Sequence, residues 1–158
     1  MKPSDGKTGA IEKKRTVAIL GVTGSIGRQT LDVIEKDRDR FNLVLITCNK
    51  DIKSLLEIAN KWDIKTVGLH SIPQKINKFL DKKVLLGNRE ISNWICNRKI
   101  DTLILCTSGI EVFEILRDCY LSFKRICISS KEIIVMAGLC GLLNTIKSKT
   151  LLIPIDSE

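Results

Sequence analysis

The sequence has few of the residues on which histidine chemistry and base stacking depend. It contains one histidine, His70, and aromatic residues make up 4% of its 158 positions. A histidine-based triad or metal cluster is disfavoured because no second imidazole is present, and we expect His70 to be solvated in a loop or at a strand end. So few aromatic rings also disfavour binding of single-stranded nucleic acid, and we expect no nucleic-acid partner.

Long apolar segments and paired cysteines are also missing. The longest nearly unbroken apolar run, residues 133–143, has 11 residues and is too short to cross a bilayer. No apolar segment follows the basic N-terminus, so we expect neither a secretory signal nor a membrane partner. No two of the six cysteines form a C-x-x-C pair. This favours small core residues in a reducing compartment over a disulfide frame or zinc site, and we predict a cytoplasmic protein.

The chain is rich in apolar residues and carries an excess of basic ones. Apolar residues make up 44% of the chain, and the formal net charge is +8. A chain of this length can bury an ordinary core in one domain. The basic balance permits phosphorylated small molecules or nucleic acid as partners and does not choose between them. Residues 1–15 are polar and basic, so we expect a disordered arm there and one domain over residues 16–158.

From residue 16 onward, short β-like segments alternate with longer segments of helical periodicity. Strands are predicted at 16–20, 41–47, 66–69, 83–86, 102–106, 125–128 and 151–155, and helices at 26–36, 53–62, 73–80, 91–96, 111–121 and 131–147. This alternation predicts an α/β fold, a doubly wound parallel sheet with helices on both faces, of the Rossmann-like type. Ligands of such sheets bind outside the carboxyl ends of the strands.

A glycine-rich turn follows the first predicted strand and opens the first helix. Its sequence is Gly21-Val22-Thr23-Gly24-Ser25-Ile26-Gly27. Gly21 permits a tight turn, Gly24 leaves room for a pyrophosphate, and Gly27 lets the helix pack closely on the strand. Backbone N–H groups and the helix dipole then face the phosphates, and Thr23 and Ser25 add hydroxyl donors. A glycine turn without a ligand is the alternative, but the strand before it and the helix after it favour a dinucleotide.

The residues after the second predicted strand bear on which dinucleotide binds. A carboxylate at this place suits the ribose hydroxyls of NAD, whereas a cation suits the 2′-phosphate of NADP. Lys50 is the candidate cation, and Asp51 beside it is a candidate cap for the next helix. A solvated Lys50 without a ligand is the alternative, and the sequence favours NADP.

Ser129-Ser130-Lys131-Glu132 stands between a predicted strand and a predicted helix. Ser129 and Glu132 have the spacing of a capping box, a structural role that competes with a catalytic one. Lys131 is not needed for a cap. It stands where a cation can meet a phosphate, a cofactor or an oxyanion.

The chain ends on Asp156-Ser157-Glu158. In an extended segment Asp156 and Glu158 face the same side. Two carboxylates suit Mg²⁺ or Mn²⁺, although such an ion needs more ligands than these two supply. Solvated terminal acids are the alternative.

Together these motifs resemble the amino-terminal domain of the 1-deoxy-D-xylulose 5-phosphate reductoisomerases. The likeness covers about residues 16–158, roughly the first third of a family member. It rests on the segment from Ala18 to Gly27 with the following Thr30-Leu31-Asp32-Val33, on Lys131-Glu132, and on Pro154-Ile155-Asp156-Ser157-Glu158. The glycine turn alone is shared with many dehydrogenases, whereas the ordered combination is far more specific.

The resemblance implies a metal-assisted reaction of non-mevalonate isoprenoid biosynthesis. The phosphorylated sugar 1-deoxy-D-xylulose 5-phosphate rearranges and is reduced by NADPH to 2-C-methyl-D-erythritol 4-phosphate, with Mg²⁺ or Mn²⁺ as the electrophile. Full-length members are homodimers. The implied cofactor-binding residues are Gly21, Thr23, Gly24, Ser25, Ile26, Gly27, Asn49, Lys50 and Ser130. The implied catalytic residues are Lys131 and Glu132, the substrate contacts Lys131, Ser157 and Glu158, and the metal ligands Asp156 and Glu158.

The chain departs from the family pattern at three places. The family has Gly-Lys-Asn where this chain has Asn49-Lys50-Asp51, and it has Asn where this chain has Ser130. Its Gly-Ala-Ala-Gly stretch appears here as Cys106-Thr107-Ser108-Gly109, a bulkier turn that could crowd the cofactor.

Two other functions stay open beside the reductoisomerase. We expect residues 1–158 alone to be inactive, because the third metal carboxylate and the phosphate-binding residues have no counterpart. A stand-alone NADP-binding module or a non-functional remnant is the alternative. A related α/β reductase with another substrate leaves the terminal Asp-Ser-Glu unexplained.

Overall fold

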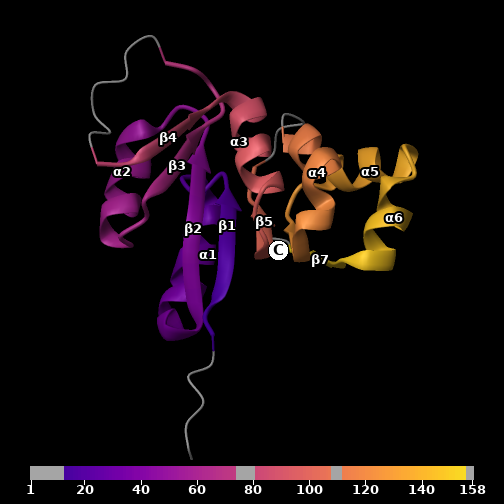
Figure 1. Cartoon of the computed structure of the whole chain (residues 1–158), viewed down its shortest axis with the longest axis horizontal. Helices are drawn as coiled ribbons and strands as arrows, with labels where there is room; N and C mark the ends of the chain where they lie inside the picture. The colour runs from indigo at the N-terminus through magenta and orange to yellow at the C-terminus, as the bar shows by residue number, and fades with distance from the viewer. Residues whose placement is uncertain (1–12, 74–80, 108–111, 156–158) are drawn as a thin grey trace, which may run out of the picture.

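The computed structural model describes residues 13–73, 81–107 and 112–155. For residues 147–149 it describes the backbone alone. Its centre is a seven-stranded sheet in the order β4-β3-β2-β1-β5-β6-β7, and every neighbouring pair is parallel (Figure 1). The strands are β1 (Arg15–Leu20), β2 (Phe41–Cys48), β3 (Thr66–Leu69), β4 (Lys83–Leu86), β5 (Ile100–Leu105), β6 (Phe123–Ile128) and β7 (Leu151–Pro154). All seven strands predicted from the sequence are confirmed, with ends that differ by up to two residues.

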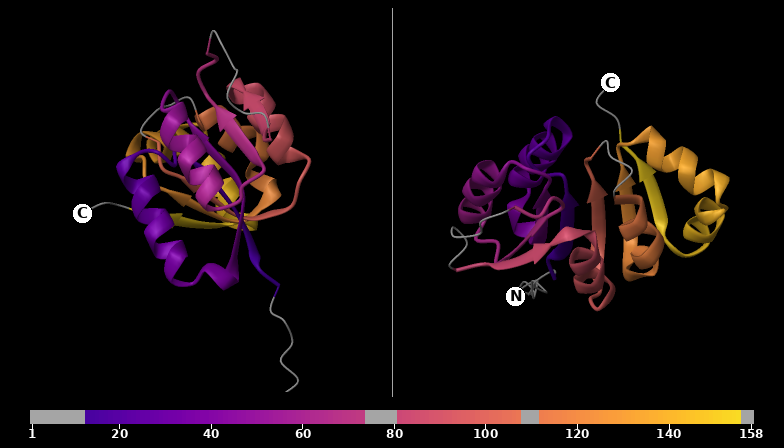
Figure 2. Two further views of the ribbon diagram at one scale, coloured as in Figure 1. Left: turned by 90° about the vertical axis from the view of Figure 1, so that its left-hand side faces the viewer. Right: turned by 90° about the horizontal axis from the view of Figure 1, so that it is seen from above.

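Helices cover both faces of this sheet. They are α1 (Ser25–Lys36), α2 (Ile52–Lys61), α3 (Gly87–Cys96), α4 (Phe113–Cys119), α5 (Lys131–Leu139) and α6 (Leu142–Lys149), with the 3₁₀ turns η1 (Arg38–Arg40) and η3 (Tyr120–Ser122). One buried cluster joins α1 and α2 to the sheet, and a second joins α3, α4, α5 and α6 to its other face. Figure 2 shows these helices arranged about the sheet. The prediction of a doubly wound α/β fold is therefore confirmed.

The buried face of α1 shows how the sequence produces this layering. Gly27, Leu31 and Ile34 are its buried residues, and their spacing of four and three places them on one side of the helix. The strands that receive such helices are apolar on both faces, as parallel strands are when helices cover them twice. In β1, for example, the last four residues are buried.

The helix predicted over residues 131–147 is wrong, because the chain forms two helices there. Gly141 has φ +74°, a left-handed conformation that ends α5 at Leu139 and turns the chain into α6. The continuous apolar run hid this break, since periodicity alone does not show where a glycine leaves the helical conformation. The helix predicted over 91–96 begins earlier, at Gly87. The helix predicted over 73–80 lies almost wholly outside the described residues.

The interpretation of all six cysteines as unpaired core residues is also wrong. Cys96 at the end of α3 and Cys119 at the end of α4 form a disulfide, with their Cα atoms 5.1 Å apart. The pair was missed because the two residues lie 23 positions apart and meet only when α3 and α4 pack side by side. Cys48 and Cys106 are buried and unpaired, as expected. Burial raises the pKa of each of their thiols to about 11.

Of the basic arm expected over residues 1–15, positions 1–12 lie outside the described residues and Arg15 begins β1. None of the helices in the described ranges is long and apolar enough to span a membrane.

Candidate functional site

The carboxyl ends of four strands lie in one row. Leu20 at the end of β1 pairs with Leu105 at the end of β5, Leu105 pairs with Ile128, and Ile128 pairs with Pro154. Neighbouring strands lie about 4.8 Å apart, so these four strand ends lie side by side along one edge of the sheet. The strand order also reverses beside β1, with β2 on one side and β5 on the other, which is where ligands of such sheets bind.

The glycine turn has the close backbone approaches that its sequence predicts. Gly21 has φ +88°, and a Cβ there would lie 3.0 Å from the carbonyl group of Cys106. A Cβ on Gly27 would lie 2.5 Å from the carbonyl oxygen of Gly21 and 2.6 Å from that of Val22. The turn therefore requires glycine at both positions, the first for its φ and the second for the contact between α1 and the turn.

The N-terminus of α1 opens toward this edge without a side-chain cap. Gly24 is its N-cap residue and makes no side-chain cap hydrogen bond to the first turn. Gly24 and Ser25 are exposed, and Thr23 is partly exposed. Uncapped N–H groups together with the helix dipole form a favourable place for an anion.

A second cation, not predicted from the sequence, borders the turn. The Nε of Arg28 donates to the carbonyl oxygen of Thr23 at 3.2 Å, and its Nη2 donates to Ser54 Oγ at 3.0 Å. Arg28 thus joins the turn to the first helical residues of α2. It was missed because it stands inside a helix, where a basic residue is ordinarily a solvated surface group.

The loop after β2 places the predicted cation at the same edge. Asn49 and Lys50 are exposed, and no described acidic side chain pairs with Lys50. Asp51 accepts a hydrogen bond from Ser54 N at 3.1 Å and caps α2, as predicted. The hydroxyl and the amide of Ser54 lower the pKa of Asp51. Asn49 accepts a hydrogen bond from the Ser71 hydroxyl, which ties this loop to the end of β3.

His70 is a second residue whose role the sequence did not reveal. It was expected to be solvated, but it is only partly exposed and both of its ring nitrogens are hydrogen-bonded. Nε2 lies 2.7 Å from Thr47 Oγ1, and Nδ1 lies 2.7 Å from Asn88 Oδ1. Thr47 in turn accepts a hydrogen bond from the Gly21 amide. These contacts join three strand ends that are far apart in the sequence.

The predicted capping box at Ser129 is wrong by one residue. The N-cap of α5 is Ser130, which accepts from Ile133 N at 3.4 Å and donates to Glu132 Oε2 at 2.8 Å. The Ser129 hydroxyl instead donates to the carbonyl oxygen of Leu105 at 2.9 Å. The chain is still pairing with β5 at Ser129, so α5 begins one residue later than the motif indicates.

The predicted catalytic pair lies at the start of α5. Lys131 and Glu132 are both exposed. Hydrogen bonding by its own backbone amide, and then by the Ser130 hydroxyl, lowers the pKa of Glu132. Ser130 itself is buried and serves as the cap. Lys131, in contrast, presents an exposed cation at this end of the row.

The predicted metal ligands cannot be placed. Asp156, Ser157 and Glu158 lie outside the described residues, as do Ser108 and Gly109 of the turn after β5. Ile155, the last described residue, donates from its backbone amide to Ile128 at 2.9 Å and leads the chain out at the carboxyl edge. Within the described ranges, no group of three or more His, Cys, Asp or Glu side chains could hold a metal ion.

The sequence is similar to proteins of one family. The profile of 1-deoxy-D-xylulose 5-phosphate reductoisomerase matches residues 17–138. A protein of that name from Clostridium botulinum strain Eklund 17B is 30% identical over 151 residues, which cover 91% of this chain and 39% of the relative. Another from Wigglesworthia glossinidia brevipalpis is 31% identical over 156 residues, which cover 91% of this chain and 38% of the relative. The chain spans about two fifths of the length of these relatives.

Solved structures of the same family share the fold. The Zymomonas mobilis reductoisomerase in complex with NADPH has a TM-score of 0.80 at 26% identity, with 92% of this chain and 40% of that chain covered. A reductoisomerase in complex with NADPH, fosmidomycin and magnesium has a TM-score of 0.78 at 26% identity, with 90% and 36% covered. The family profile matches well over half of the chain, and the chain therefore belongs to the 1-deoxy-D-xylulose 5-phosphate reductoisomerase family.

Proposed function

We propose that this chain binds NADPH as the dinucleotide-binding part of a reductoisomerase. The whole protein would convert 1-deoxy-D-xylulose 5-phosphate to 2-C-methyl-D-erythritol 4-phosphate with Mg²⁺ or Mn²⁺. The observation that carries the proposal is the uncapped N-terminus of α1, which follows the glycine turn at the point where the strand order reverses. A solved relative holds NADPH, fosmidomycin and magnesium together.

The described residues suit a phosphorylated dinucleotide. The glycine turn leaves no Cβ at Gly24, where a phosphate would approach the first N–H groups of α1, and Thr23 and Ser25 add hydroxyl donors. Lys50 and Arg28 supply positive charge on the β2 side of the turn, where the 2′-phosphate of an adenosine would lie. When bound, the nicotinamide would supply the hydride for the reduction.

The residues on the β6 side would act on the substrate. Lys131 is exposed at the carboxyl edge and would attract a phosphate or an oxyanion between cofactor and substrate. The Ser130 hydroxyl orients the carboxylate of Glu132 beside it. We propose that Asp156 and Glu158 hold the metal ion, which would act as a Lewis acid, and that Ser157 contacts substrate.

Thermal unfolding of the chain with NADPH, with NADH and without ligand tests the cofactor. A ligand at ~100 times its dissociation constant should add about 2.7 kcal/mol to the free energy of unfolding. We expect a larger shift with NADPH than with NADH at equal concentration, because only NADPH carries the 2′-phosphate. Equal shifts would argue against the NADP assignment, and no shift with either would argue against dinucleotide binding.

A lysine substitution tests how the phosphate is read. Lys50→Ala should weaken NADPH binding about tenfold, since a charge-assisted hydrogen bond to phosphate is lost, and should leave NADH binding unchanged. Lys36→Ala is the matched control, because Lys36 is exposed at the other end of α1. A loss of NADPH affinity as large in the Lys36 variant would indicate a general charge effect.

Two further predictions belong to the whole protein. We propose no nucleic-acid partner, and a homodimer when the protein has the full length of its relatives. The cytoplasmic location expected from unpaired cysteines loses that support, because Cys96 and Cys119 are paired. A stand-alone NADP-binding module would give the same binding results as the enzyme. Formation of 2-C-methyl-D-erythritol 4-phosphate by the full-length protein, measured with purified substrate and Mg²⁺, separates the two.

A further inference from the structure

Thr47 is a polar residue in an otherwise apolar part of β2. It is fully buried, and its Oγ1 accepts a hydrogen bond from Gly21 N at 3.2 Å. Its carbonyl oxygen accepts from Gly21 N at 3.1 Å and from Val22 N at 2.9 Å. A single residue of β2 therefore holds the first two amides of the glycine turn.

A hydrogen-bonded chain extends from Thr47 across two more strand ends. His70 Nε2 lies 2.7 Å from Thr47 Oγ1, and His70 Nδ1 lies 2.7 Å from Asn88 Oδ1. With the amide oxygen of Asn88 facing the ring, Nδ1 carries the proton and Nε2 accepts from the Thr47 hydroxyl. The hydroxyl oxygen of Thr47 then keeps a lone pair for the Gly21 N–H.

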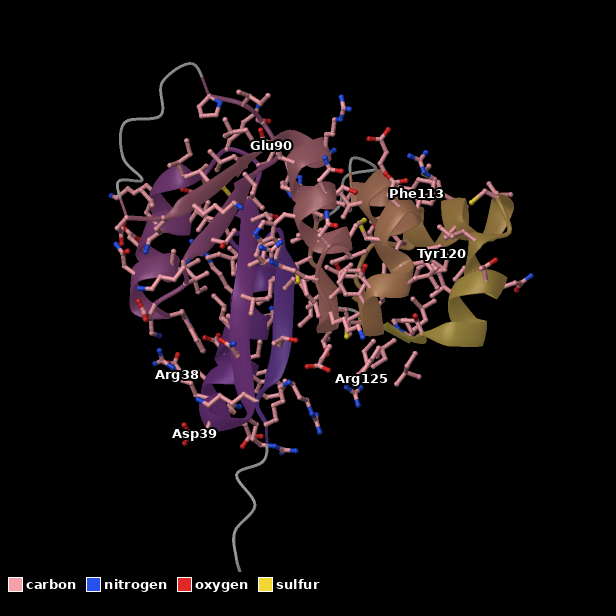
Figure 3. All side chains as sticks on the ribbon, in the orientation of Figure 1. Arg38, Asp39, Glu90, Phe113, Tyr120 and Arg125 are labelled. Carbon is pink, nitrogen blue, oxygen red and sulfur yellow. A yellow bond between two sulfur atoms is a disulfide. The ribbon has the colours of Figure 1, made fainter. Side chains whose placement is uncertain are left out.

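The surrounding residues restrict this arrangement. A Cβ on Gly68 would lie 2.8 Å from Thr47 Cγ2, so the absence of a side chain at Gly68 makes room for the threonine. His70 N donates to the carbonyl oxygen of Cys48 at 3.0 Å, which fixes the backbone at the histidine. Asn88 lies in the first turn of α3, whose Glu90 binds the Leu86 amide at the same end of the molecule (Figure 3).

We infer that Thr47, His70 and Asn88 are positioning residues that hold the glycine turn in its phosphate-binding conformation. The inference rests on the proposed NADPH binding, which it deepens. Gly21 has a left-handed backbone, and glycine has the largest conformational freedom of any residue. A turn that is fixed before the ligand arrives binds more tightly, because less conformational entropy is lost on binding. None of the three side chains needs to touch NADPH for this effect.

Substitution of Thr47 tests the inference directly. Thr47→Val keeps the shape and removes the hydroxyl, and we expect the dissociation constant for NADPH, measured by calorimetry, to rise about tenfold. Thr47→Ser keeps the hydroxyl and should restore most of the affinity. The matched control is Thr150→Val, because Thr150 is a buried threonine far from the turn whose Oγ1 donates to Phe123 O at 3.0 Å. It should lower stability and leave the dissociation constant unchanged.

The amide resonance of Gly21 gives a readout that does not depend on the ligand. In the ligand-free chain, His70→Phe should shift this resonance through Thr47, since the phenyl ring offers no acceptor to the Thr47 hydroxyl. An unmoved Gly21 resonance in both the Thr47→Val and His70→Phe variants would overturn the inference. So would equal affinity of the Val and Ser variants, or an equal loss in Thr150→Val. A wild-type chain that fails to bind NADPH would overturn the proposed function, and the resonance would still test the positioning.

Discussion

The absence of a side chain at Gly27 allows α1 to pack against the backbone of the glycine turn. A Cβ there would lie 2.5 to 2.7 Å from backbone atoms of Gly21 and Val22, which have no flexible end to move aside. Gly27→Ala should therefore destabilise the fold by about 1–3 kcal/mol, the usual cost of overpacking. Urea unfolding measures the change, and a variant as stable as the wild type would show that α1 can shift away from the turn.

The candidate site was partly visible in single residues. Local signals identified Gly21, Lys50 and Asp51, because a turn, a cation after a strand and a helix cap each depend on neighbours in sequence. Arg28 and His70 were missed, since their partners Ser54, Thr47 and Asn88 lie 18 to 26 positions away. No periodicity or motif marks such a pair.

The junction between α5 and α6 depends on the backbone conformation of one glycine rather than on a side-chain contact. Gly141 has φ +74°, and a Cβ there would meet nothing within 4 Å. Gly141→Ala should cost about 1–2 kcal/mol, the penalty for a left-handed non-glycine residue. Gly138→Ala is the control, because Gly138 lies inside α5 and its Cβ would be 3.4 Å from Leu143 Cδ1. The control variant should raise the free energy of unfolding by at most about 1 kcal/mol. Equal effects in urea unfolding would contradict this explanation.

The amino ends of β1, β5 and β6 are joined by one carboxylate. Asp101 accepts hydrogen bonds from Thr16 N at 2.9 Å and from Lys124 Nζ at 2.7 Å. The Lys124 ammonium, followed by the Thr16 amide, lowers the pKa of Asp101 to about 2.

This lowered pKa predicts a pH dependence with a definite sign. A group whose pKa is lower in the folded state stabilises the fold above its unfolded pKa of about 3.9 and loses that contribution as the pH falls toward 2. We expect a loss below about 2 kcal/mol between pH 5 and pH 2, because Lys124 is largely exposed and the pair is screened. Asp101→Asn should reduce the pH slope of urea stability in this window, and an unchanged slope would contradict the prediction.

At the scale of the whole molecule, the disulfide joins two helices on one face of the sheet. Cys96 and Cys119 are separated by 23 positions, and closing a loop of that size should stabilise the fold by about 3 kcal/mol on the chain-entropy model. Addition of a dithiol reductant should lower the free energy of unfolding by this amount. Cys140→Ser, at an exposed and unpaired cysteine, should not change the effect. Six titratable thiols in the unreduced, denatured chain would rule the pairing out.

The sequence by itself determined the alternation of strands and helices, the parallel sheet and the place of the glycine turn. These follow from signals that act over a few residues: the two hydrophobic periods, the φ that Gly21 requires, and the spacing between a cap and its helix. Tertiary structure decided which residues meet. The order β4-β3-β2-β1-β5-β6-β7 and the strand registers bring Thr47, His70 and Asn88 together, and the packing of α3 on α4 pairs Cys96 with Cys119. Such contacts depend on the relative positions of whole elements, which no local pattern in the chain records.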